Sequence, residues 1–337
     1  MPPDLIPRFI NGPFEDPGLL IPFRFRKEAV LMDMGDISPL PSKDILKINH
    51  AFVTHTHMDH FFGFDRLLRL LLGRDKHLHI YGPKGFLENT EAKLSAYSWN
   101  LVENYKESLR ITAHEIREDR MVSRSYSCRE RFSPGSETLE SPFRGVILEK
   151  PGFTVSAKIL DHGIPVLAFV VKERFHIHIK KNALMELGLS TGPWLTQFKK
   201  SLYGLEDPDS IVQVPAIEMG SAREFRLEEL KQAITVITPG QKIAYVSDVA
   251  FHKENAERII DFVRDADRLF IEACFLDQHK EIAGEKHHLT ARQAGEIAAR
   301  AKVKHFDIFH FSPRYQGQEQ SLYEEARQAF TVGIQTP

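Results

Sequence analysis

The alternation of apolar and polar positions along this chain predicts both strands and helices. Short apolar runs typical of buried strands occur at residues 30–34, 51–54, 78–81 and 109–116. Between them, residues 67–72 and 84–105 carry apolar side chains at three- and four-residue spacing, which is typical of helices. Strands that alternate with helices favour layers of sheet and helix, so this half of the chain predicts an α/β sandwich.

The middle of the chain has a different pattern. Residues 120–145 are polar and contain Pro134-Gly135, which predicts a long loop or a hairpin. Residues 146–171 then predict successive strands that turn at Pro151-Gly152 and at Gly163-Ile164-Pro165. Residues 179–204, which have lysine pairs near both ends and a turn at Gly192-Pro193, predict a compact helical insert.

Strand and helix resume in the last third of the chain. Strands are expected at residues 242–247, 269–275 and 306–311, and helices at residues 254–264, 290–301 and near 320–330. The pattern contains no short-period repeat and no low-complexity tract.

Composition narrows the class of protein. The chain has 337 residues, 42% of them hydrophobic, and 44 basic against 46 acidic side chains, so its overall charge indicates neither a nucleic-acid nor a membrane partner. Two cysteines, Cys128 and Cys274, are too few for a disulfide framework and fit a reducing cytoplasm. The N-terminus lacks a signal-peptide pattern, and no apolar run reaches the ~18 residues that span a bilayer. We therefore expect a cytoplasmic protein, and its 16 histidines call for a use.

Four side chains that can bind metal lie within six residues of one another, in the stretch HTHMDH directly after the predicted strand at 51–54. His55 and His57 are two residues apart and would share one face beyond the strand end, while Asp59 and His60 would begin the next helix. Two imidazoles directed at one centre and a carboxylate with a third imidazole at another is the arrangement that two metals ~3.5–4 Å apart require.

Three further candidates follow or lie within later apolar runs: Asp161-His162-Gly163, Val246-Ser247-Asp248 and Phe309-His310-Phe311. Strand ends converge on one rim in layered α/β proteins, so these distant positions could meet the histidine-rich stretch.

The stretch HTHMDH matches the His-x-His-x-Asp-His signature of the metallo-β-lactamase superfamily, and His162, Asp248 and His310 match its remaining ligand motifs in order. Within that superfamily the chain resembles the ribonuclease Z family from about residue 30 to 315. Asp33 in LMDMGD matches the family's early aspartate, and the segment beginning IEACFLDQH resembles its Glu-Ala-Thr and His-Ser-Thr block. The stretch GLSTGP resembles the family's transfer-RNA-gripping arm.

The resemblance implies a fold and a site. The fold would be a four-layer αββα metallo-β-lactamase sandwich, a single domain over residues 1–337 with a helical arm insert at about 179–204. The implied ligands are His55, His57 and His162 for one metal and Asp59, His60 and His310 for the other, with Asp248 as the bridge. Asp59 would orient a water or take its proton, and His288, held by Glu272, would protonate the leaving oxygen. Neighbouring His287 is a weaker candidate for that proton donor.

The implied activity is that of a dinuclear metal-dependent phosphodiesterase that cleaves RNA endonucleolytically, at the 3′ end of precursor transfer RNA. Two Zn²⁺ ions are the expected cofactors, with Mn²⁺ or Fe²⁺ as alternatives, and they would lower the pKa of a shared water from about 15.7 toward ~7. The expected partners are RNA or a small phosphodiester, with no membrane; a homodimer stays open. Two other interpretations also stay open: a hydrolase of a small ester, lactone or cyclic nucleotide, and a nucleic-acid-binding protein with a vestigial site. The intact ligand set argues against the second.

The chain departs from the family pattern in three places. The stretch FINGPFEDPGLLIPFRFRKEAVLM replaces the family's Gly-rich opening strand and Pro-x-Lys-x-Arg-Asn loop, which senses the RNA 3′ end. Ile271 and Leu289 replace the first histidine and the serine of the two later motifs. The metal core is thus complete, whereas the terminus-sensing loop is absent.

Other histidines and aromatic residues are assigned structural roles. We expect strand-surface or packed imidazoles at His50, His77, His79, His114, His176, His178, His252, His279 and His305, and core packing for Phe61, Phe62 and Phe64. For Lys180, Lys181, Lys199 and Lys200 the sequence leaves two alternatives, a phosphate-binding patch or a solvated helix face.

Overall fold

The computed structural model describes residues 5–24, 27–216 and 222–335, and the chain divides into two compact units. The small unit comprises residues 148–154 and 171–241 with 1–4, and the large unit comprises residues 5–147, 155–170 and 242–337. The single-domain organisation over 1–337 stays a prediction, and its ends at 1–4 and 336–337 lie outside the described residues.

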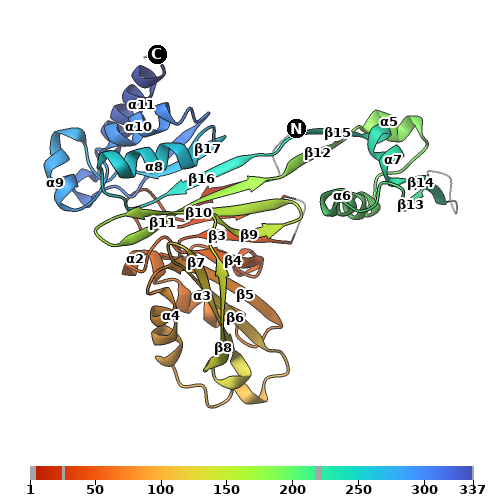
Figure 1. Cartoon of the computed structure of the whole chain (residues 1–337), viewed down its shortest axis with the longest axis horizontal. Helices are drawn as coiled ribbons and strands as arrows, with labels where there is room; N and C mark the ends of the chain where they lie inside the picture. The colour runs from red at the N-terminus through yellow and green to blue at the C-terminus, as the bar shows by residue number, and fades with distance from the viewer. Residues whose placement is uncertain (1–4, 25–26, 217–221, 336–337) are drawn as a thin grey trace. The chain divides into compact units, whose positions relative to one another are not determined.

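An eight-stranded sheet of the large unit carries its strands in chain order (Figure 1). The strands are β1 (Arg8–Phe9), β2 (Leu19–Pro22), β3 (Ala29–Met32), β4 (Ile48–Phe52), β5 (Lys76–Pro83), β6 (Leu109–Ile116), β7 (Arg120–Ser127) and β8 (Pro134–Pro142). Strands β3 to β6 are parallel to one another, so their carboxyl ends meet at one edge. The polar segment predicted as a loop or hairpin is the antiparallel hairpin β7–β8.

The second sheet has six strands in the order β18-β17-β16-β11-β10-β9. They are β9 (Val146–Lys150), β10 (Phe153–Asp161), β11 (Pro165–Glu173), β16 (Lys242–Val246), β17 (Arg268–Glu272) and β18 (Phe306–Phe309). Strands β16, β17 and β18 are parallel, and they are short apolar runs because both of their faces are covered.

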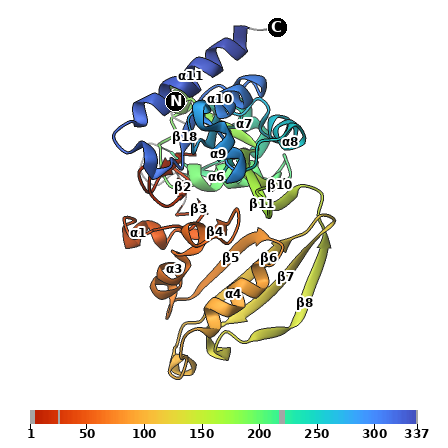
Figure 2. The same ribbon diagram turned by 90° about the vertical axis from the view of Figure 1, so that its left-hand side faces the viewer.

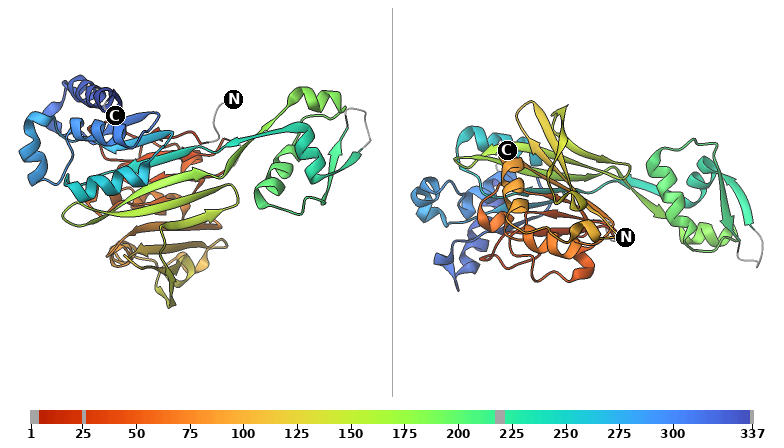
Figure 3. Two further views of the ribbon diagram at one scale, coloured as in Figure 1. Left: turned by 45° about the horizontal axis from the view of Figure 1, so that its top comes forward. Right: turned by 90° about the horizontal axis from the view of Figure 1, so that it is seen from below.

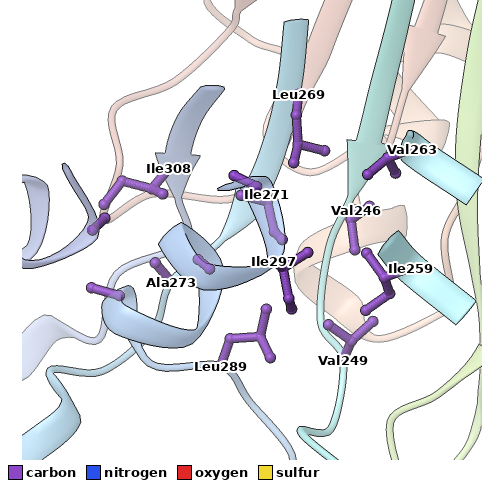
Figure 4. Packing of buried hydrophobic residues seen from close by; sticks show 14 of the residues in the cluster. Val246, Val249, Ile259, Val263, Leu269, Ile271, Ala273, Leu289, Ile297 and Ile308 are labelled. Atoms are coloured by element: carbon purple, nitrogen blue, oxygen red, sulfur yellow. The ribbon is translucent and has the colours of Figure 1, made fainter. Parts of the chain in front are cut away.

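Helices cover the outer faces of the two sheets. Against the eight-stranded sheet pack α1 (Ser42–Ile45), α3 (Phe64–Leu71) and α4 (Phe86–Ser95), and against the six-stranded sheet pack α8 (Lys253–Val263), α10 (Ala291–Arg300) and α11 (Glu319–Gln335). Figures 2 and 3 show the orange and the blue helices on opposite sides of the pair of sheets. Each helix layer has its own apolar cluster with the sheet beneath it; Figure 4 shows that of β16–β18. The predicted four-layer sandwich is confirmed.

The described residues 175–216 and 222–239 of the small unit form two antiparallel strand pairs and three helices. Strand β12 (Phe175–Ile179) pairs with β15 (Thr235–Pro239), and β13 (Ile211–Pro215) pairs with β14 (Ala222–Arg226). The helices are α5 (Lys181–Glu186), α6 (Trp194–Gly204) and α7 (Leu227–Ile234). The predicted insert at 179–204 contains α5 and α6, and the unit continues to residue 241 because Ile177, Phe198 and Leu230 share one apolar core.

Most predicted elements are present with shifted ends. The helix expected at 84–105 was predicted too long, since α4 ends at Ser95. The indole N–H of Trp99 donates to the carbonyl of Leu94 at 2.7 Å, so this carbonyl is satisfied from outside the helix and the chain turns away. In the described part of the chain, no helix combines the length and the apolar character needed to cross a membrane.

Candidate metal centre

The seven predicted ligands meet at the edge where the parallel strands of both sheets end. His55 and His57 follow β4, and Asp59 and His60 lie in the short helix α2 (Met58–Phe61). The other three follow the ends of β10, β16 and β18: His162, Asp248 and His310. We call these seven residues the histidine–aspartate cluster.

The cluster contains two groups that could each hold a cation. The ligand atoms of His55, His57, His162 and Asp248 lie within 4.8 Å of one another, and so do those of Asp59, His60 and His310. The structure therefore brings together the residues that the sequence assigned to each of two metals.

Distances around Asp248 Oδ2 fit metal coordination better than direct hydrogen bonding. The Nε2 atoms of His55 and His162 are both 3.7 Å from Asp248 Oδ2, and His60 Nε2 is 3.5 Å from the same oxygen. A hydrogen bond is ~2.7–3.2 Å long, whereas ligand atoms around a tetrahedral ion with bonds of ~2.0–2.1 Å lie ~3.3 Å apart. The three imidazole nitrogens therefore lie from Asp248 Oδ2 at distances closer to the spacing of two ligands on one metal ion than to the length of a hydrogen bond.

Some buried imidazole nitrogens of this cluster have no hydrogen-bond partner within the described residues. Among the described residues, Nε2 of His55 and Nε2 of His60 are fully buried without a hydrogen-bond partner. Such orphaned atoms cost free energy unless something binds them. Their Nδ1 atoms, in contrast, contact Thr54 Oγ1 at 3.1 Å and Asp33 Oδ2 at 2.9 Å, and His162 Nδ1 donates to the backbone carbonyl of His287 at 2.8 Å. All three imidazoles are held through Nδ1, which leaves Nε2 for a metal.

Electrostatics at the cluster favour a cation. Although burial opposes ionisation, the charges of His310 and His60 hold the pKa of Asp248 well below its usual range, and a hydrogen bond from His310 together with the charge of His60 lowers the pKa of Asp59. Burial lowers the pKa of His55 to about 2, so this imidazole is a neutral ligand. Two ionised carboxylates beside a neutral imidazole are the donor set that a divalent ion needs.

Asp33, the residue that matches the family's early aspartate, supports the cluster through hydrogen bonds. It is fully buried with a positive φ of 54°, and its carboxylate accepts from the backbone N–H of Thr54 at 2.7 Å and from His60 Nδ1. Gly35 allows the Asp33 loop to approach α2, because a Cβ there would lie 2.4 Å from the Asp59 carbonyl oxygen.

Tyr245 is a residue at the site that our reading of the sequence missed. Its hydroxyl donates to Asp33 Oδ2 at 3.0 Å across the two sheets. Its ring stacks on Phe309, next to His310, with centroids 5.2 Å apart. The only signal in the sequence was its place three residues before Asp248.

His288 and Glu272 form a pair beside the cluster. His288 Nδ1 donates to Glu272 Oε1 at 3.1 Å, and the backbone N–H of Val249 donates to the same oxygen at 2.8 Å. Although burial opposes the charged form, the carboxylate of Glu272 raises the pKa of His288 to about 9. The ligand atoms of His288 and Glu272 lie within 4.8 Å of those of Asp248, whereas the side chain of His287 is exposed.

The apolar residues near the ligand motifs differ in burial. Phe61 and Phe64 are buried, but the core prediction for Phe62 is wrong: it is 53% exposed, because it lies in the turn between α2 and α3 and outside the apolar cluster that contains Phe61 and Phe64. Ile271 and Leu289, which replace polar residues of the family, lie together in the apolar core (Figure 4).

The histidines expected in structural roles include a ladder on β4, β5 and β6, formed by His50, His77, His79 and His114. His79 Nδ1 lies 3.1 Å from His114 Nε2, and His114 Nδ1 lies 2.7 Å from the Ser123 hydroxyl. These imidazoles are packed on strands, as predicted.

The comparisons with known proteins agree with this geometry. No family model matches the chain. It is 28% identical to ribonuclease Z of Deinococcus radiodurans over 85% of this chain and 83% of the relative, and 30% identical to ribonuclease Z of Thermococcus sibiricus over 89% and 82%. The crystal structure of the metallo-β-lactamase-fold protein YhfI from Bacillus subtilis has the same fold, with a TM-score of 0.54 at 14% identity over 97% of this chain and 94% of that one. On its sequence, its fold and its histidine–aspartate cluster, the chain belongs to the ribonuclease Z family of metallo-β-lactamase-fold hydrolases.

Proposed function

We propose that this protein is a two-metal phosphodiesterase that cleaves RNA, with the 3′ end of precursor transfer RNA as its substrate. The observation that carries the proposal is the convergence of the seven residues of the histidine–aspartate cluster in a chain whose relatives over most of its length are named ribonuclease Z. A cluster with buried, orphaned Nε2 atoms argues for a working centre rather than a vestigial one.

Each metal position has its own ligands in this proposal. His55, His57 and His162 would hold one Zn²⁺, Asp59, His60 and His310 would hold the other, and Asp248 would be a ligand of both. When bound, the pair would supply an activated water near neutral pH and positive charge for the phosphate oxygens. Imidazole and carboxylate ligands also accept Mn²⁺ or Fe²⁺.

Protein side chains supply the proton transfers. Asp59 is 41% exposed and is held ionised by His60 and His310, which lets it orient the attacking water or take its proton. His288 is charged near neutral pH and is fixed by Glu272, so it donates a proton to the leaving ribose oxygen.

A panel of substrates tests the proposed activity. Metal-loaded protein is incubated with precursor transfer RNA, with bis-p-nitrophenyl phosphate and with a lactone. Cleavage of the RNA at one position near its 3′ end, with slower turnover of the small phosphodiester, supports the proposal. Turnover of the lactone without RNA cleavage would contradict it, and His57→Ala serves as the control for a contaminating nuclease.

The small unit supplies the RNA contacts in this proposal. The side chains of Lys180, Lys181 and Lys200 are all exposed, and Lys180 Nζ lies 3.5 Å and 3.4 Å from the carbonyls of Gln232 and Ala233 at the end of α7. Because Lys180 already contacts these carbonyls, we assign the phosphate contacts to Lys181 and Lys200.

A charge reversal tests these contacts in the full chain. The double change Lys181→Glu and Lys200→Glu should weaken RNA binding and reduce the log–log salt slope by about 0.9 for each lost phosphate contact, as on duplex. The small phosphodiester should be cleaved as before. Lys253→Glu, at an exposed lysine of α8, is the matched control. Unchanged affinity and slope in the double variant would remove transfer RNA as the substrate.

A second candidate function is hydrolysis of a small ester, lactone or cyclic nucleotide by the same centre. Apolar side chains beside the ligands favour it: Met58, Ile164 and Phe251 are 79%, 41% and 42% exposed. The opening segment also favours it, because it replaces the loop that senses the RNA 3′ end in the family. Asn11 holds this segment by donating to the carbonyls of Asp16 and Asp36 at 2.8 Å. We therefore expect the protein to discriminate poorly among RNA ends.

A further inference from the structure

Cys274 lies beside the histidine–aspartate cluster, two residues beyond Glu272 at the end of β17. The residue is 7% exposed, and its Sγ lies within 4.8 Å of ligand atoms of His288 and His310. A thiol and two imidazoles this close together have the composition of a metal site.

This second ligand set differs in chemistry from the first. The histidine–aspartate cluster offers only nitrogen and oxygen, which suit several divalent ions, whereas a thiolate selects softer ones such as Zn²⁺, Co²⁺ or Cd²⁺. His288 is prepared for ligation, because a histidine whose Nδ1 bonds to a carboxylate presents Nε2 to the metal, and Glu272 Oε1 is that partner at 3.1 Å.

A negative charge lies next to this ligand set. Glu272 is fully buried, and within the described residues its Oε2 has no hydrogen-bond partner. The orphaned oxygen offers a cation at Cys274 further charge compensation at short range.

We propose that a third divalent cation of the soft class binds at Cys274, His288 and His310 when metal is in excess, and that it inhibits the enzyme. Binding forms bonds from the ion to Cys274 Sγ, to His288 Nε2 and to the His310 nitrogen that the metal pair leaves free. It releases three protons to solvent: the thiol proton, the extra proton of the His288 imidazolium and the remaining N–H proton of His310. The ion occupies His288, the proton donor of the proposed function, on which this inference rests, and it shares His310 with the metal pair.

The geometry agrees with a site that fills last. The site has three ligand side chains, and one of them, His310, also belongs to the histidine–aspartate cluster. A site that must share a ligand should bind an ion more weakly than the complete cluster does.

Cobalt spectroscopy tests the inference on the full chain, without reference to activity. Metal-free protein is titrated with Co²⁺. The first two equivalents should give only ligand-field bands, and a third should add the near-ultraviolet band of thiolate-to-cobalt charge transfer. Cys274→Ser should lack that band, whereas Cys128→Ser, at the other buried cysteine, should keep it.

Inhibition gives the second readout. Excess Cd²⁺ should stop cleavage of bis-p-nitrophenyl phosphate by the zinc-loaded enzyme, and Cys274→Ser should require at least about tenfold more Cd²⁺. Cys128→Ser should match the wild type.

Three results would overturn the inference. A wild-type protein that binds two Co²⁺ ions and never shows the thiolate band has no third site. A thiolate band with the first equivalent places Cys274 in the primary centre instead. A protein that binds no Co²⁺ fails both this inference and the metal centre of the proposed function, so the two failures are distinguishable.

Discussion

Replacing Tyr245 by phenylalanine tests how the two sheets hold the metal centre together. The side chain is buried, and its hydroxyl donates to Asp33 Oδ2 at 3.0 Å, the same oxygen that accepts from His60 Nδ1 at 2.9 Å. Tyr245→Phe removes this one donor and keeps the ring that stacks on Phe309. The substitution is therefore confined to the hydrogen bond.

The expected size of the effect follows from the charge and burial of the acceptor. A hydrogen bond to a charged group is worth ~1.5–3 kcal/mol, and Asp33 keeps its bonds from the N–H of Thr54 at 2.7 Å and from the Thr54 hydroxyl at 3.0 Å. We expect the free energy of unfolding to fall by about 1.5–3 kcal/mol. Because Asp33 orients His60, metal affinity should also fall, by the ~10–100-fold typical of lost partners behind a ligand.

Two measurements separate stability from metal binding. Urea unfolding of the metal-free protein gives the first, and competition with a chelator gives the second. Tyr126→Phe is the matched control, since Tyr126 is also fully buried and donates at 2.8 Å to Glu91, a residue outside the cluster. The control should lose stability and keep its metal affinity. If Tyr245→Phe also binds metal as tightly as the wild type, the Asp33 network does not position His60.

The other predictions concern ligation, catalysis and pH. His57→Ala should lose metal as well as activity, and elemental analysis that finds the wild-type content after reconstitution with Zn²⁺ and Mn²⁺ would contradict its role. His288→Ala should keep both metals and lose ~10²–10⁴ in rate; a wild-type rate on a substrate with a poor leaving group would contradict its role as proton donor. Burial, with the charges of His79 and His77, lowers the pKa of His114 to about 3, below its ordinary 6.5. The unfolded state therefore binds a proton at this residue before the folded state does, so the free energy of unfolding is at its full value above pH 6.5 and falls as pH drops from 6.5 toward 3. Each pH unit below 6.5 should cost ~1.4 kcal/mol, and urea unfolding of His114→Asn should show a shallower acid dependence than the wild type.

Local sequence was sufficient where chemistry and backbone geometry are set by near neighbours. HTHMDH follows an apolar run and precedes a helical pattern, so a strand end and a helix start place its four ligands side by side whatever the rest of the chain does. The same holds for the turns at Pro151-Gly152 and Gly163-Ile164-Pro165, each of which depends on residues within a few positions. The order of the later single ligands was informative only through the family resemblance.

Tertiary structure decided the features whose partners are far apart in the chain. The hydroxyl of Tyr245 meets Asp33 across 212 positions, and no spacing rule reaches that far. The sequence indicated no role for Cys274 beyond excluding a disulfide framework, and only the fold places its thiol beside His288 and His310. The small unit extends beyond the predicted insert because β12 pairs with β15, whose residues lie some sixty positions later in the chain. Periodicity predicts which side of an element is apolar. The packing of whole layers decides which elements face each other, and it thereby places the single polar groups that act at the site.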